Sequence, residues 1–255
     1  MRFRPCIDLR GGQVVQIVGG TLTVGVEPTT NYTATRSSAE FAALYRANHL
    51  TGGHVIALGP GNDHAARAAL AAFPGGMQMG GGITPDTAHD YLDAGASHVI
   101  VTSYLFVDGE LDLGRLASMV QCVGRERLVL DLSCRRRGSD YWVVSEHWQR
   151  FTALAVRRDS LHALAEHCAE FLVHGVDVEG LRAGFEAPLV SLLGEHSPVP
   201  VTYAGGLRSI DDLNALQRLG ANRVDATIGS ALDIFGGDLP YRDVCTWQQQ
   251  HSQQC

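Results

Sequence analysis

Two glycine-pair turns, each following a short apolar stretch, constrain the fold of this chain more than any other feature. Gly81-Gly82 follows residues 77–80, and Gly205-Gly206 follows residues 201–204. In both copies a segment with helical periodicity comes next, and then a second apolar stretch that ends near Ser103 or near Ser230. The near-equal spacing of about 125 residues marks an internal repeat. Strands alternating with helices in two similar halves predict a (β/α)8 TIM barrel built from two half-barrels.

A pair of aspartates obeys the same repeat. Asp8 lies at the end of the first predicted strand, and Asp131 lies at the equivalent point of the fifth. In a (β/α)8 barrel the carboxyl ends of the strands form the active-site face, so the two carboxylates are expected on opposite sides of the barrel mouth. Each aspartate alone could simply cap a loop. Because both occur at equivalent points, we interpret them as a general acid and a general base.

The glycine turns themselves predict phosphate binding. A strand that ends in paired glycines and opens onto a helix exposes backbone N–H groups at the positive end of the helix dipole. Glycine is also routine in strand-to-helix connections, so one such turn would be weak evidence. Two turns, half a repeat apart, predict a ligand with a phosphate at each end and a reactive middle between Asp8 and Asp131.

Length and composition fit a single domain of this kind. The chain has 255 residues, of which 45 % are hydrophobic and 18 % charged, and a (β/α)8 barrel needs about 250 residues. No linker or shift in composition divides the sequence, so residues 1–255 are expected to form one barrel. We expect a monomer.

Composition also excludes several classes of function. All twenty basic residues are arginines, so Schiff-base lysine chemistry, pyridoxal phosphate attachment and a Walker A site are excluded. The net charge of −7 argues against a nucleic-acid partner. Six cysteines without a C-x-x-C spacing and eleven histidines without a metal-binding spacing predict reduced thiols and no metal. No long apolar run or leader pattern occurs, so we expect a cytoplasmic protein without a membrane partner.

Two connections are longer than a barrel loop requires. Residues 19–37 show no helical period, and residues 133–150 contain a predicted hairpin around 141–144. Loops of this length are usually functional or mobile. Elsewhere, Asp63 is expected to cap the helix that follows the second strand.

Four features allow two interpretations each. The run Arg135–Arg137 is either a solvated charged stretch or a substrate contact. Trp142 and Trp148 either stack a flat heterocycle or hold the loop in place. His174, at the end of the sixth predicted strand, either faces the mouth, where it would contact substrate, or packs in the core.

Taken together, these motifs resemble the phosphoribosylformimino-5-aminoimidazole carboxamide ribotide (ProFAR) isomerases of histidine biosynthesis, in their fungal and plant branch. The matching motifs span nearly the whole chain in order: CIDLRGGQVVQIVGGTL, HVIALGPGND, QMGGGI, VIVTSYLF, RLVLDLSCR, FLVHGVDVEGL, YAGGLRS and IGSALDIFGG. The resemblance implies an Amadori rearrangement of an aminoaldose to an aminoketose without metal or cofactor, acting on a small bis-phosphorylated ribotide.

The resemblance also implies roles for individual residues. Asp8 would be the general base that takes a proton from C2′ of the opened ribose, and Asp131 the general acid that assists ring opening. Other candidates for binding the substrate or its phosphates are Gly20, Gly81, Gly82, Thr102, Ser103, His174, Gly205, Gly206, Gly229 and Ser230. The chain departs from the bacterial pattern in two places, since Thr84 replaces a common basic residue and His174-Gly175 replaces a Thr-Asp pair.

Three other functions remain open at this level. The cyclase half of imidazole glycerol phosphate synthase shares the two-fold barrel and both aspartates, but usually carries a lysine where this chain has Gln16. A non-catalytic phosphate-binding barrel would need no acid–base pair. A bifunctional isomerase that also acts in tryptophan synthesis is the third.

Overall fold

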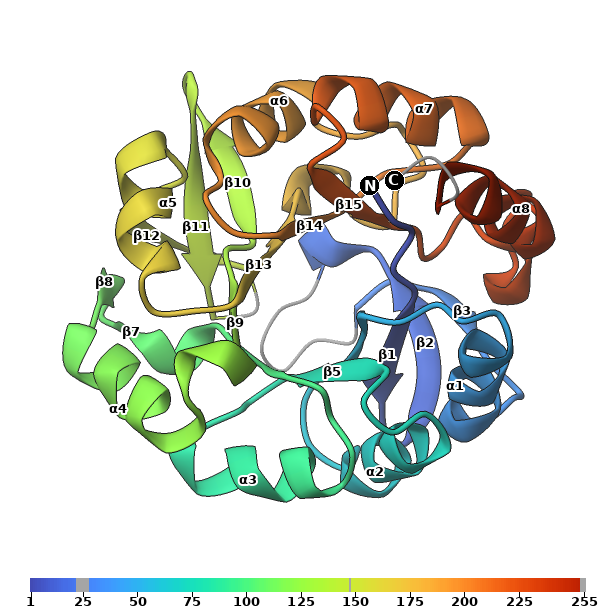
Figure 1. Ribbon diagram of the computed structural model, residues 1–255, viewed down its shortest axis with the longest axis horizontal. Coiled ribbons are helices and arrows are strands. Elements are labelled where there is room, and N and C mark those ends of the chain that lie inside the picture. Colours follow the sequence, from blue (N-terminus) through green and yellow to red (C-terminus); the bar gives the residue numbers. More distant parts are fainter. Residues whose placement is uncertain (22–27, 147, 253–255) are drawn as a thin grey trace.

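Eight parallel strands form a barrel inside a ring of helices, as seen along the barrel in Figure 1. The computed structural model describes residues 1–21, 28–146 and 148–252. The barrel strands are β1 (Cys6–Arg10), β4 (Gly53–Ala57), β5 (Met77–Gly80), β6 (Val99–Val101), β9 (Leu128–Asp131), β13 (Glu170–His174), β14 (Val201–Ala204) and β15 (Val224–Thr227). The barrel closes where Phe3 bridges Ala226 in parallel and the Arg4 N–H donates to the Ala226 carbonyl at 2.8 Å. The predicted fold is confirmed.

The helices follow the strands in the order that the repeat predicts. They are α1 (Ser38–Ala47), α2 (Asp63–Ala72), α3 (Pro85–Asp93), α4 (Leu113–Val123), α5 (Arg158–Ala165), α6 (Ala187–His196), α7 (Ile210–Leu219) and α8 (Tyr241–Ser252). Short 3-10 turns supplement them: η1 (Gly19–Thr21), η2 (Ser103–Leu105), η3 (Arg125–Arg127), η4 (Val176–Val178) and η5 (Asp233–Phe235). Helices α3 and α7 follow the two glycine pairs, as expected from the two-fold repeat.

Alternation along each strand decides which side chains reach the barrel interior. On β9, Leu128 and Leu130 pack outward in the main core, whereas Val129 belongs to a separate small cluster with Ile100 and Leu172. Because successive side chains of a strand point to opposite faces, the inward set on β9 continues with Asp131. The same period turns Asp8 inward on β1 and His174 inward on β13. These side chains therefore reach the mouth from the strand ends.

Extra strands extend the carboxyl end of the barrel. β2 (Gln13–Ile17) runs antiparallel to β1, and β3 (Thr30–Thr33) pairs with β2. The expectation that residues 19–37 form a loop without regular structure was therefore wrong at β3. Residues 22–27 of this predicted loop lie outside the described residues. A hairpin does occur in residues 133–150, within a larger sheet of β10 (Cys134–Arg137), β11 (Asp140–Ser145) and β12 (Arg150–Ala155). Residues 141–144 lie inside β11, and the turn between β10 and β11 falls at residues 138–139. A two-stranded ribbon, β7 (Phe106–Val107) and β8 (Glu110–Leu111), precedes α4.

One expected helix cap is also corrected. Asn62, and not Asp63, occupies the N-cap position of α2 and makes no side-chain capping bond. The Asn62 side chain instead accepts from Gly12 N–H at 2.9 Å and donates to the Gly59 carbonyl at 2.9 Å. Asp63 is the first helical residue, and its carboxylate pairs with Arg67 one turn later. Asn62 thus ties the loop after β4 to the β1–β2 turn.

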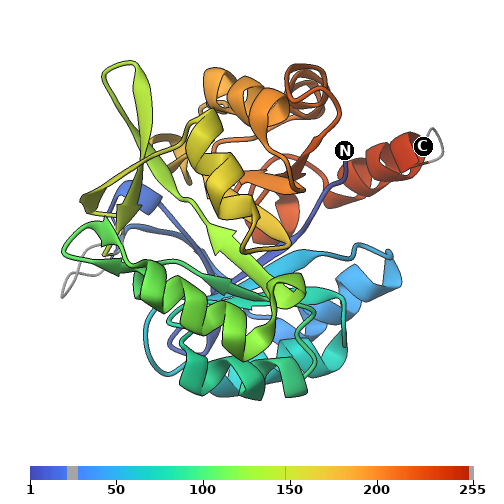
Figure 2. The ribbon, with the colours of Figure 1, turned by 60° about the vertical axis from the view of Figure 1, so that its left-hand side comes forward.

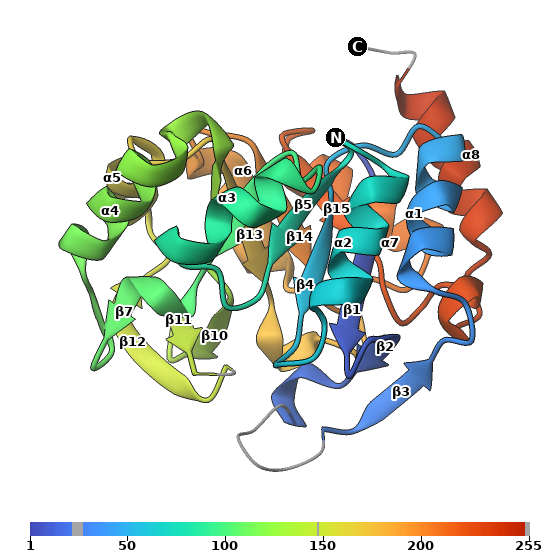
Figure 3. The ribbon, with the colours of Figure 1, turned by 90° about the horizontal axis from the view of Figure 1, so that it is seen from below.

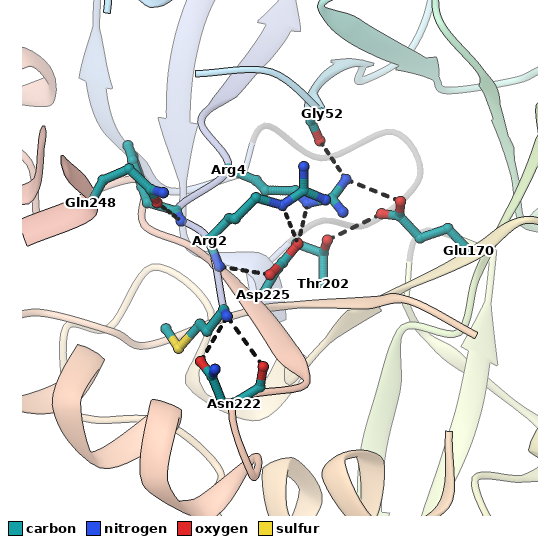
Figure 4. A network of polar contacts seen from close by, with 10 residues as sticks. Arg2, Arg4, Gly52, Glu170, Thr202, Asn222, Asp225 and Gln248 are labelled. Carbon is teal, nitrogen blue, oxygen red and sulfur yellow. Dashed lines mark hydrogen bonds and ion pairs between the residues drawn. The ribbon is translucent and has the colours of Figure 1, made fainter. Parts of the chain in front are cut away.

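Figure 3 shows the N-terminus at the end of the barrel opposite the β10–β12 sheet, and Figure 2 shows the β10–β11 hairpin standing away from the barrel. At the terminal end, a buried polar network fills the barrel (Figure 4). The Arg4 side chain, 3 % exposed, pairs with Asp225 at 2.6 Å and with Glu170 at 3.0 Å, and Thr202 donates to Glu170 at 3.1 Å. This end is tied together by structural contacts, and the opposite end carries the candidate site.

The structure also bears on the predictions about membrane-spanning segments and cysteines. Among the residues that it describes, no helix is both long and apolar enough to cross a bilayer. The five described cysteines are free thiols, and Cys255 lies outside the described residues.

Candidate active site

The two glycine pairs adopt the same unusual backbone conformation at equivalent strand ends. Gly81 and Gly82 have φ angles of +98° and +69°, and Gly205 and Gly206 have φ angles of +122° and +75°. Such left-handed angles favour glycine. A Cβ at Gly206 would also lie 2.0 Å from the Gly184 carbonyl oxygen, and one at Gly81 would lie 2.2 Å from the Ala57 oxygen. The sequence repeat is therefore a repeat of two matching backbone turns.

Both turns offer unused hydrogen-bond donors. Among the described residues, the backbone N–H groups of Gly82, Gly206 and Ser230 donate to no protein acceptor. The buried hydroxyl of Thr227 has no partner either, and it lines the same cavity as Gly206 and Ser230. Because an unpaired buried polar group is costly, the buried Thr227 and Ser230 favour a ligand that accepts hydrogen bonds in this cavity, whereas Gly82 is exposed. We call residues Gly81, Gly82, Thr102 and Ser103 the first cradle, and Gly205, Gly206, Gly229 and Ser230 the second cradle.

Three adjoining cavities connect the two cradles across the barrel mouth. The cavity at the second cradle shares Asp8, His174 and Glu179 with a central one. The central cavity shares Asp131 and Trp148 with a third one, which contains the first cradle. We call this continuous space the trough. A molecule with a phosphate in each cradle would lie with its middle between the two aspartates.

Asp8 lies in an environment that disfavours its charge. Its carboxylate accepts one hydrogen bond from Gln16 on β2, at 3.2 Å, and the Gln16 side chain is itself buried. Burial and the nearby carboxylate of Glu179 raise the pKa of Asp8 to about 7, against the smaller opposing effects of His174 and Gln16. A carboxylate with a pKa near neutrality is well matched to act as a general base.

Asp131 lies in the opposite environment, although the repeat places it at the equivalent point. Its Oδ1 accepts from the Ser133 N–H at 2.8 Å and from the Ser133 hydroxyl at 2.6 Å, and its Oδ2 accepts from Thr102 at 3.1 Å. Burial alone would raise the pKa of Asp131, but the contacts with His174 and Ser133 outweigh burial and lower it. Asp131 is therefore ionised near neutral pH.

His174 links the two halves of the trough. The side chain is 8 % exposed and lies 3.1 Å from the Ser133 hydroxyl through Nδ1, which is also 3.7 Å from Asp131 Oδ1. Its ring centroid lies 5.5 Å from the Trp148 ring and 6.0 Å from the His54 ring. Among the alternatives for His174, the structure supports a position facing the mouth.

Comparison with known proteins decides the family. Residues 2–239 match the model of the family described as histidine biosynthesis protein. The chain belongs to this family. It is 51 % identical over 257 residues to a relative from Medicago truncatula, which covers 98 % of this chain and 82 % of that protein. It is 48 % identical over 260 residues to a relative from Yarrowia lipolytica and 43 % identical over 258 residues to one from Saccharomyces cerevisiae, covering 98 % of each chain. All three relatives are named 1-(5-phosphoribosyl)-5-((5-phosphoribosylamino)methylideneamino)imidazole-4-carboxamide isomerase, and the plant one is called chloroplastic.

The structure of this histidine biosynthesis protein brings most of the predicted site residues together. All four residues of the first cradle and all four of the second line the trough, as do Asp8, Asp131 and His174. The hydroxyl of Thr102 is already bonded to Asp131, so it contributes to the carboxylate as well as to the cavity wall. Gly20 lies in η1, is exposed, and is not among the residues that line the trough.

The structure shows what the arginines and tryptophans of the loop between β9 and α5 contact. Arg135 pairs with Asp177 at 2.8 Å, and the guanidinium groups of Arg135 and Arg137 lie over the Phe151 ring, away from the trough-lining residues. Trp142, on β11, packs its ring under the guanidinium group of Arg157. Trp148 lines both the central cavity and that of the first cradle. Of the two tryptophans, Trp148 is therefore the one placed to contact a ligand.

Sequence reasoning missed several residues of the site in this family member. Glu179, which follows η4, lies beside Asp8; burial raises its pKa, which His174 lowers to a smaller extent. Ser133 and Gln16 fix the two aspartates, and His54 faces the same cavity as Asp8. The available signal was a pair of acidic residues, Asp177 and Glu179, in the glycine-containing loop after the sixth strand. No cluster of His, Cys, Asp and Glu with metal-binding geometry occurs within the part of the chain that the structure describes.

Proposed function

We propose that this chain is the ProFAR isomerase of its organism, converting the aminoaldose ProFAR to the aminoketose PRFAR during histidine biosynthesis. The names of its relatives describe a substrate with two 5-phosphoribosyl groups joined through an imidazole carboxamide. The observation that carries the proposal is the trough, which has one phosphate cradle at each end and one inward aspartate on each side of its middle.

Asp8 is the proposed general base. It removes the proton from C2′ of the opened ribose, next to the carbon that bears nitrogen, and the hydrogen bond from Gln16 fixes its direction. Anchoring both phosphates holds the reacting carbon against Asp8, which converts binding energy far from the reaction into rate. Asp131, on the opposite side, belongs to the half of the site that opens the sugar ring.

Under this proposal the reaction uses no metal and no cofactor, because it opens one sugar ring and moves protons among its atoms without any transfer of electrons to another molecule. We further propose that the protein acts as a monomer in the cytoplasm and needs no macromolecular partner. Sedimentation of the purified protein and fractionation of cells that express it test these two points. An obligate complex with a glutaminase would contradict the proposal that the protein acts as a monomer without a partner.

The deciding experiment is conversion of purified ProFAR by the purified chain, with a chelator present and no partner protein, followed by chromatographic separation of the two isomers. The wild type is expected to convert ProFAR, and Asp8→Asn is expected to lose a factor of about 10² to 10⁴ in kcat with little change in KM. If ProFAR binds without conversion, while added ammonia and PRFAR yield a cyclised product, the chain is a cyclase and the proposal fails. If Asp8→Asn converts ProFAR as fast as the wild type does, the acid–base assignment fails.

A further inference from the structure

A proton count around Ser133 fixes the protonation of the neighbouring histidine ring. Ser133 has one hydroxyl proton, and its 2.6 Å contact with the ionised Asp131 carboxylate uses that proton, because a carboxylate only accepts. The 3.1 Å contact between the Ser133 oxygen and Nδ1 of His174 therefore needs its proton from the ring. His174 thus carries a proton on Nδ1, and its Nε2 edge is left for the trough.

This arrangement is the one that proton-transfer histidines use. A carboxylate that holds one ring nitrogen as a donor fixes the tautomer and orientation, so the other nitrogen can exchange a proton with substrate. Here the link from Asp131 to the ring runs through Ser133, since the direct separation is 3.7 Å. His174 lines both the cavity of Asp8 and the central cavity beside Asp131.

We propose that His174, oriented by Asp131 through Ser133, is the acid that protonates the ribose ring oxygen in this reaction. The inference rests on the proposed function, and it replaces Asp131 as the proton donor. Asp131 then serves as the anion that positions and stabilises the charged imidazole ring. The donor would come from a side chain that stands where the bacterial pattern has threonine.

The charges that face His174 favour the cationic ring. Asp131 on β9, Glu179 after η4 and Asp8 on β1 all raise the pKa of His174, and together they outweigh burial, which lowers it. The other titratable group at the ring, His54 on β4, stays neutral because burial lowers its pKa to about 3. Of His174 and Asp131, therefore, His174 is the one that carries the proton.

The proton movements balance over one turnover. Nε2–H of His174 gives its proton to the ring oxygen as the C1′–O bond breaks, and the nitrogen lone pair forms the C1′=N bond. Asp8 then takes the C2′ proton, and those bonding electrons form the C1′=C2′ bond and neutralise the nitrogen. In the final tautomerisation Asp8 returns its proton to C1′, and the proton of the C2′ hydroxyl returns to Nε2. Both residues regain their starting states, and no electron acceptor is needed.

The test compares pH profiles of His174→Gln with those of the wild type and of His54→Gln, which removes a second buried histidine of the same cavity. We expect His174→Gln to lose a factor of about 10² to 10³ in kcat with KM within a few-fold. The alkaline limb of its kcat/KM profile should disappear, and the acid limb should move upward because the cation that favours ionised Asp8 is gone. His54→Gln should keep the alkaline limb, whatever its maximum rate.

A second measurement does not depend on any variant being active. Titration of ¹⁵N-histidine-labelled wild-type protein, with the His174 signals assigned by their loss in His174→Asn, should show both ring nitrogens protonated at pH 6. Asp131→Asn should lower the midpoint of this titration.

Each outcome is decisive for one proposal. An unchanged alkaline limb in His174→Gln with an active wild type, or a His174 ring that is neutral at pH 6 or lacks the Nδ1 proton, overturns this inference alone. A wild-type protein that binds ProFAR without converting it overturns the proposed function, and this inference with it.

Discussion

Asp8 makes the pH dependence of this protein predictable. Burial and Glu179 raise its pKa to about 7, and the base must be ionised to accept the C2′ proton. With a midpoint at pH 7, about one Asp8 in eleven is ionised at pH 6 and about one in a hundred at pH 5. The value of kcat/KM should therefore fall about tenfold for each pH unit below 7.

Two substitutions should move this acid limb in opposite directions. Glu179→Gln removes the carboxylate that raises the pKa of Asp8, so the limb should move to lower pH, by about one pH unit. It should not reach the usual carboxyl range, because burial, the larger cause, remains. Gln16→Leu removes the hydrogen bond that favours the ionised form, so the limb should move to higher pH.

The assay is kcat/KM for ProFAR conversion between pH 4.5 and 9, which reports ionisations of the free enzyme and free substrate. Substrate phosphates also titrate near pH 6, but they contribute equally in every variant. The shift between variants, and not the absolute midpoint, therefore tests the electrostatics. A wild-type limb with its midpoint near pH 4, or an upward shift in Glu179→Gln, would refute this reasoning.

Three further predictions address stability and phosphate binding. Arg4→Met leaves the buried carboxylate of Glu170 without its cation and removes the buried one of the two arginines at Asp225, so it should cost about 3–5 kcal/mol in free energy of unfolding. Arg67→Met, which removes only exposed pairing, should cost at most about 1 kcal/mol. Equal losses in urea unfolding would contradict this. Gly206→Ala should raise KM for ProFAR at least tenfold. Gly124→Ala, at a matched φ of +74° against +75° but in open space, should lose about 1–3 kcal/mol of stability through its backbone alone and leave KM unchanged. Since the folded-state pKa of Asp8 is raised from 3.8 to about 7, ionised Asp8 destabilises the fold increasingly between these pH values. Asp8→Asn should therefore be about 3–5 kcal/mol more stable than the wild type at pH 8 and no more stable at pH 3.5. Thermal unfolding at both pH values measures this.

The barrel and the two glycine-pair turns could be predicted from the sequence because both depend on local signals. Alternating strands and helices, and glycines at strand ends, are features that a short window reveals. Strand β3 was missed because its TNYT segment is short and polar, and pairing with β2 stabilises it. Such pairing is a tertiary effect that a propensity argument does not include.

Partners distant in the sequence could not be predicted in the same way. Ser133 and His174 are 41 residues apart, and their contact exists only because β9 and β13 are neighbours in the barrel. Arg4 and Asp225 are 221 residues apart and meet where the barrel closes. Individual residues of these pairs can be named from sequence, but their chemistry depends on which strand ends the fold places together.

The two-fold repeat predicts equivalence, yet the chemistry of the site depends on how the repeat is broken. Asp8 and Asp131 occupy matching strand ends, but an added antiparallel strand brings Gln16 to Asp8 and the loop after β13 brings Glu179. Asp131 receives three hydrogen-bond donors and a histidine instead. One carboxylate therefore titrates near neutrality and the other stays ionised. Because their neighbours move the two pKa values apart, the two aspartates can take different roles in one reaction. Asp8 can act as the base, and Asp131 can act as the anion that positions the acid, His174.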